Sequence, residues 1–155
     1  MDYAAQLIFL ILLIICIVTD CRRRIIPDII TLPGMLMFML LHWIRGDLVW
    51  WEPIVGVIGL GGISLFLAII SKGKLGGGDI KLFAMIGAYL GWSVGIWAFL
   101  FTFPLAALLA WPLLIVRKVA PNKLNVPSEL PLAPFIGMST ILLIALLQKV
   151  AEAHV

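Results

Sequence analysis

The sequence has few charged residues, little cysteine and little histidine. Charged residues make up only 12% of the 155 residues, whereas 63% are hydrophobic. A soluble domain is roughly a quarter charged and half apolar, so one small core cannot bury this much apolar surface. The composition therefore indicates an integral membrane protein. The formal charge of +3 does not indicate nucleic-acid binding, because the basic residues lie between apolar runs.

With two cysteines and two histidines, the sequence has no cluster with the spacing of zinc ligands. Cys16 and Cys21 form no CxxC pair, and we interpret them as free thiols without a function.

The first apolar run does not have the pattern of a cleaved signal peptide. No basic segment precedes it, and three arginines follow it where a signal peptide would have a small-residue cleavage site. We therefore expect the first run to remain a membrane helix, and we expect no cofactor and no metal.

Six apolar runs predict an all-α, polytopic membrane protein: one domain over residues 1–155 with a bundle of about six transmembrane helices. A turn between Gly91 and Gly95 separates a short fourth helix from the fifth. At about 1.5 Å per residue, the fourth cannot cross ~30 Å of hydrocarbon alone. The predicted helices are about 7–18 (extended to 3–19), 29–44, 54–70, 79–90, a fifth ending near 116, and 132–148.

The basic residues predict the orientation of the chain. With six spans, nine of the eleven Lys and Arg residues fall in loops on one side of the membrane. The positive-inside rule assigns that side to the cytoplasm and both termini to the outside. Asp20, after the first run, and Asp79, behind three glycines, then both lie at cytoplasmic helix ends.

Two carboxyl groups held together in a partly dry site tend to share one proton. An aspartic hydrolase uses this state: the ionised partner takes a proton from water, and the protonated partner stabilises the oxyanion that forms on the scissile carbonyl. Glycines before Asp79 would let a substrate backbone approach closely. Alternatives remain open: a helix cap at Asp79, a proton-coupled transporter, a metal site, or a membrane scaffold that does not need the acids.

The motifs around the two acids resemble those of the type IV prepilin peptidases, membrane aspartic proteases of the GxGD type. Gly76-Gly77-Gly78-Asp79-Ile80-Lys81-Leu82 resembles the start of the family's GxGDxKL pattern. Asp20, with Ile26-Pro27-Asp28 behind it, resembles the first catalytic segment of the family. Leu130-Pro131-Leu132-Ala133-Pro134-Phe135 resembles a late Pro-Phe-Gly-Pro segment, with Leu132-Ala133 in place of Phe-Gly.

The resemblance implies six transmembrane helices in a prokaryotic plasma membrane, with Asp20 and Asp79 catalytic. It implies prepilin or pseudopilin substrates, which have a basic leader and a hydrophobic stem, cut at the cytoplasmic face. The chain looks like a short form without the N-terminal CxxC insertion of larger members, so we expect cleavage without N-methylation. The residues expected to bind the substrate are Gly76, Gly77, Gly78, Lys81, Pro27, Asp28 and Glu129.

Overall fold

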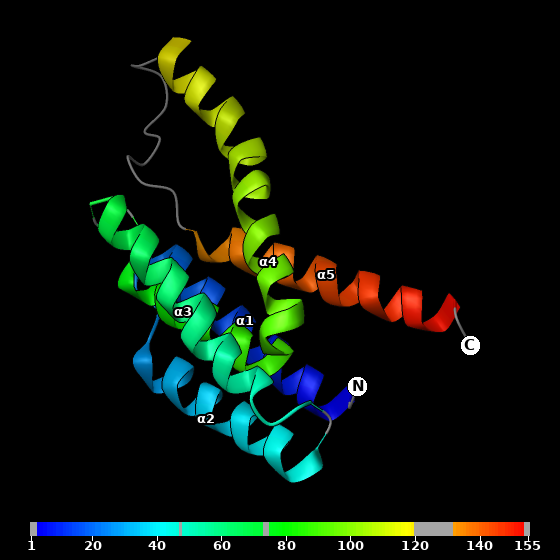
Figure 1. Ribbon diagram of the computed structural model, residues 1–155. Coiled ribbons are helices and arrows are strands. Elements are labelled where there is room, and N and C mark those ends of the chain that lie inside the picture. Colours follow the sequence, from blue (N-terminus) through cyan, green and yellow to red (C-terminus); the bar gives the residue numbers. More distant parts are fainter. Residues whose placement is uncertain (1–2, 47, 73–74, 120–131, 154–155) are drawn as a thin grey trace.

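The computed structural model describes residues 3–46, 48–72, 75–119 and 132–153, most of which lie in helices (Figure 1). Five helices in this part of the chain are long and apolar enough to cross a membrane. The fourth is broken at Gly91, so the chain has six helical segments there, and the expected all-α membrane bundle is confirmed. The helices are α1 (Tyr3–Arg23), α2 (Asp28–Arg45), α3 (Glu52–Ile70), α4 (Gly77–Val119) and α5 (Ala133–Ala153).

The break in α4 lies at Gly91, whose φ of 73° and ψ of 178° are not helical. After the break the chain folds back on itself, as a short distance shows: a Cβ added at Gly95 would lie 3.6 Å from the Cα of Gly87. The segment 77–90 is roughly 20 Å long at about 1.5 Å per residue, as short as expected. No turn extends to Gly95, however: helical structure resumes directly after Gly91.

Side chains from neighbouring helices compensate for this break. The carbonyl of Tyr89 lies near the break, and His42 Nε2 donates to it from the end of α2 at 2.9 Å. A backbone carbonyl freed by a broken membrane helix needs such a partner, since lipid offers none. A side-chain hydrogen bond also joins α3 to the segment after the break, where Ser93 Oγ donates to Glu52 Oε1 at 2.7 Å.

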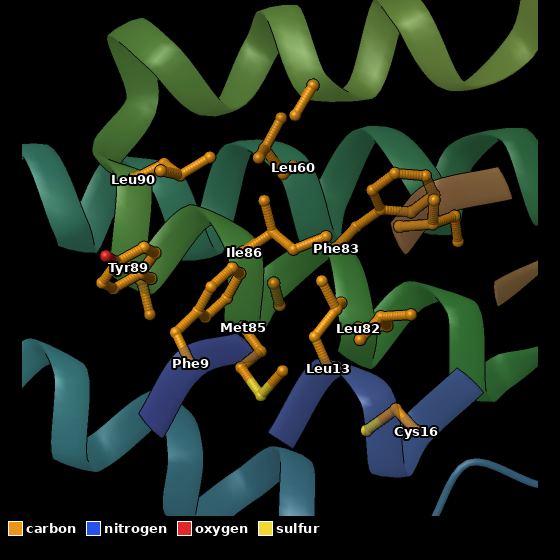
Figure 2. Packing of buried hydrophobic residues seen from close by; sticks show 14 of the residues in the cluster. Phe9, Leu13, Cys16, Leu60, Leu82, Phe83, Met85, Ile86, Tyr89 and Leu90 are labelled. Atoms are coloured by element: carbon orange, nitrogen blue, oxygen red, sulfur yellow. The ribbon is translucent and has the colours of Figure 1, made fainter. Parts of the chain in front are cut away.

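The first half of α4 is the centre of the bundle, and every residue from 82 to 91 is buried. Figure 2 shows Phe9 of α1 lying against Tyr89 of α4. The two rings stack with centroids 4.1 Å apart, and Phe38 of α2 meets Tyr89 edge-on at 5.0 Å. A helix buried on all sides must be apolar all round, which explains why the sequence has no polar face here.

Small residues allow α3 to pack directly on α4. A Cβ on Gly56 would lie within 3 Å of the Gly87 carbonyl group, so the two backbones touch. Close backbone approach through glycine is typical of helix packing in membranes. The second half of α4 and α5 are joined differently, by a buried hydrogen bond of 2.8 Å between Thr102 and Ser139.

Several helices are longer than the sequence predicts. α1 continues through Asp20 to Arg23, where a loop was expected, and α5 continues beyond Gln148 to Ala153. Arginines in the last turn of α1 favour helix there, because cations interact well with the negative end of the helix dipole. α2 passes through Pro33 without ending, as expected.

Candidate active site

A cavity of about 320 Å³ lies where the C-terminal end of α1 meets the N-terminal ends of α2 and α4. It contains both acids that the sequence singles out, together with the three consecutive glycines. The lining residues are Asp20, Arg24, Ile25, Ile26, Asp28, Gly76, Gly77, Gly78, Asp79 and Lys81.

Asp20 lies inside the last turn of α1 and is only 8% exposed. The prediction that it follows the first helix is wrong, since α1 extends to Arg23. Its Oδ2 accepts the backbone N–H of Ala133 at 3.3 Å. Ala133 is the first residue of α5, so the carboxylate lies at a helix N-terminus, where partial positive charge favours an anion.

Asp79 is the third residue of α4 and is also 8% exposed. Its Oδ2 accepts the backbone N–H of Gly76 at 3.2 Å, which is the bond of a helix cap. Capping therefore occupies one oxygen of Asp79, as Ala133 occupies one oxygen of Asp20. Among the described residues, no hydrogen bond reaches Oδ1 of either acid. The two carboxyl groups are close enough for their charges to interact.

The glycines before Asp79 differ in what surrounds them. A Cβ on Gly78 would lie 2.8 Å from the Cβ of Ile26, in the connection between α1 and α2. A Cβ on Gly77 would meet nothing within 4 Å. Only a residue without a side chain at position 78 lets α4 begin so close to the connection that follows Asp20.

The other residues predicted to bind substrate lie in three different situations. Lys81 and Asp28 both line the cavity and form an ion pair, with Nζ and Oδ1 2.5 Å apart and the side chains 39% and 53% exposed. Pro27 is the N-cap of α2 and is not among the lining residues. Glu129 lies outside the described residues.

Sequence reasoning missed two groups at this site. One is the N–H of Ala133, although the late Pro-Phe segment had been singled out without a role. The other is Arg24, which lines the cavity and ends α1 with a left-handed φ of 53°. Its N–H donates to the carbonyl of Asp20 at 2.8 Å. The run of three arginines was a signal, but nothing in it distinguished the third.

Comparison with known proteins places the chain in a family. The sequence model of the type IV leader peptidase family matches residues 7–111. The chain belongs to this family. The matched range contains Asp20, Arg24 and Asp79, whereas Ala133 lies beyond it.

Similar proteins carry the name of the same family. A prepilin leader peptidase/N-methyltransferase of Bacillus subtilis (strain 168) is 36% identical over 138 residues, which are 87% of this chain and 52% of that protein. Proteins of the same name from Klebsiella pneumoniae and Pseudomonas putida are 37% and 28% identical over 56% and 77% of this chain, and over 40% and 42% of their own lengths. This leader peptidase family member thus spans about half the length of these relatives. No solved structure matches the chain.

Proposed function

We propose that this protein is a membrane aspartic endopeptidase that removes the leader peptide of type IV prepilins or related pseudopilins. The observation that carries the proposal is the convergence of Asp20 and Asp79 on one cavity, each fixed through Oδ2 by the N–H of a helix start. Family membership supports the same reaction class.

In the proposed reaction, one carboxyl group is ionised and the other is protonated. The ionised group takes a proton from a water molecule, and the oxygen of that water attacks the carbonyl carbon of the scissile peptide bond. The protonated group hydrogen-bonds the carbonyl oxygen, where negative charge develops. The intermediate then collapses as the C–N bond breaks and the leaving nitrogen takes a proton. Fixing Oδ2 of each acid leaves both Oδ1 atoms for these transfers.

The proposed site faces the cytoplasm. Nine of the eleven basic residues lie in the helix ends and connections that the sequence assigns to this side, and the positive-inside rule places that side in the cytoplasm. Such a position at the end of the helices suits a substrate whose leader is basic and whose stem is hydrophobic, because the bond between the two parts lies at the membrane boundary.

We further propose that Asp28 interacts with the basic leader. Among the described acids of the cavity, Asp28 has no role in the proposed chemistry. It is half-exposed, so a basic leader can reach it beside its partner Lys81. Glu129 is the second acid assigned to this role by the sequence. The exposed glycines Gly76 and Gly77 offer a surface to the substrate backbone. Lack of N-methylation remains a prediction.

Co-expression with candidate prepilins tests the proposal. Wild type should convert the precursor to a shorter product on a gel, and mass spectrometry should place the cut after the leader. The Asp79→Asn variant, inserted at the same level, should leave the precursor intact. A transporter or a scaffold would give no processing in either strain, and processing by the Asn variant would contradict the assignment of Asp79.

A further inference from the structure

Among the described residues that line the candidate active site, two are cations, and their surroundings differ. Lys81 is bonded to Asp28, so its charge is already compensated. Arg24 forms no such pair among the described residues, and its charge acts on Asp20 from the end of the same helix. Asp79, in turn, faces the charge of Asp20.

Arg24 also has an unusual backbone conformation. Its φ of 53° lies in the left-handed region, where glycine or asparagine usually ends a helix. A residue held in a sparsely populated conformation beside a reactive cavity is a reason to look for a role of its side chain. Glycine would end α1 there without strain, but it would supply no charge.

With all groups ionised, the described lining residues of the cavity carry a net charge of minus one. Among the described lining residues, the three carboxyl groups of Asp20, Asp28 and Asp79 exceed the two cations by one. A single proton would therefore neutralise this part of the lining, and one proton is what an acid–base pair needs. Cys16, one turn before Asp20 in α1, is a further titratable group among the described residues that interacts with the charge of Asp20.

We infer that Asp20 is the ionised general base and Asp79 the protonated acid, and that Arg24 is a positioning residue that holds the negative charge on Asp20. This inference rests on the proposed function, because it divides the roles within the proposed pair. The N–H of Ala133 at the start of α5 acts in the same direction as Arg24.

The test is the pH dependence of kcat/KM for the full chain in detergent, with a peptide that contains a leader cleavage site. Arg24→Gln and Arg24→Gly should move the acid limb to higher pH, because the base loses its cation and is protonated sooner. Below the wild-type acid midpoint their kcat/KM should fall roughly three- to tenfold, since the guanidinium is solvent-exposed and screened. In both variants the alkaline limb should remain at the wild-type pH. Arg24→Lys should keep the whole wild-type profile.

Arg23→Gln is the matched control, since Arg23 is an exposed neighbour that does not line the cavity, and it should leave both limbs in place. If Arg24→Gly keeps the wild-type profile, Arg24 only ends the helix and the inference falls. If the alkaline limb moves instead, the roles of the two acids are reversed. Neither result affects the proposed function, which fails if wild type leaves the prepilin uncut or if the Asp→Asn variants cleave it.

A second measurement needs no proteolysis. An ionised carboxylate opens a small aryl epoxide: an ester bond forms, the ring C–O bond breaks, and the resulting alkoxide takes a proton from the protonated partner. Peptide mapping by mass spectrometry should find the ester on Asp20. An ester on Asp79 would overturn the assignment even if no prepilin were cut.

Discussion

Gly78 and Ile26 lie so close that a Cβ added at Gly78 would be 2.8 Å from the Cβ of Ile26. This contact sets the distance between the start of α4, which carries Asp79, and the connection that follows Asp20. The backbone around the site therefore depends on the absence of one methyl group.

Alanine at the neighbouring glycines should have opposite effects. Gly78→Ala should destabilise the protein by about 1–3 kcal/mol, because the new methyl group overpacks against Ile26. Gly77→Ala meets open space and should be neutral or stabilise by up to about 1 kcal/mol. Thermal unfolding in detergent and the cleavage rate check both variants. Equal losses in the two would show that flexibility of the loop, rather than the contact with Ile26, is what matters.

The native cysteines report the orientation of the chain. Cys21 is exposed at the end of α1 near the candidate site, whereas Cys16 is buried. A membrane-impermeant maleimide should label Cys21 only after the cells are permeabilised. Trp50→Cys in a Cys21→Ser background should be labelled in intact cells, because Trp50 is exposed in the connection between α2 and α3, at the end of α2 away from the candidate site. Labelling of Cys21 from outside would contradict a cytoplasmic site.

The ion pair between Asp28 and Lys81 should matter more for substrates than for folding. With side chains 53% and 39% exposed, it should contribute about 0–1 kcal/mol to stability. Asp28→Asn should raise KM for a substrate with a basic leader, leave kcat unchanged, and leave KM for a neutral leader as it was. If Asp28→Asn and Glu129→Gln both leave cleavage of the basic-leader substrate unchanged, local charge recognition is wrong.

The break in α4 requires glycine at position 91. The φ of 73° with ψ of 178° is open essentially to glycine alone, and a Cβ would lie 2.6 Å from Glu52 Oε2. Gly91→Ala should therefore lower the free energy of unfolding by about 1–3 kcal/mol. Gly62→Ala, at a helix position with no atom within 4 Å of the new Cβ, should be tolerated. Comparable thermal shifts in both would contradict this account of the break.

Hydropathy and glycine spacing were sufficient to predict the membrane bundle. Apolar runs had to be helices, because lipid leaves backbone groups no other partners. The short helical segment before Gly91 was predicted from the position of the turn glycines in the apolar run. Helix ends were harder, since the last turn of α1 carries charges and a charged helix end has the same composition as a loop.

The candidate site was predictable only in part. Two acids at the ends of apolar runs stood out, because charge is costly in such a chain. The N–H of Ala133 could not be predicted. Ala133 is 113 residues away from Asp20 in the sequence, and every residue except proline has a backbone N–H, so the composition does not identify the donor. The left-handed conformation of Arg24 could not be read from its side chain, which disfavours it.

The central claim is that Asp20 and Asp79 act as one unit, and initial cleavage rates test it most directly. The rates of wild type, Asp20→Asn, Asp79→Asn and the double variant should be compared at matched membrane levels, with Arg23→Gln, an exposed residue that does not line the cavity, as the control. Each single variant should lose roughly 10³-fold or more, and the double variant should be scarcely worse, because groups that act together are not additive. Substantial cleavage by either well-inserted single variant would contradict the account.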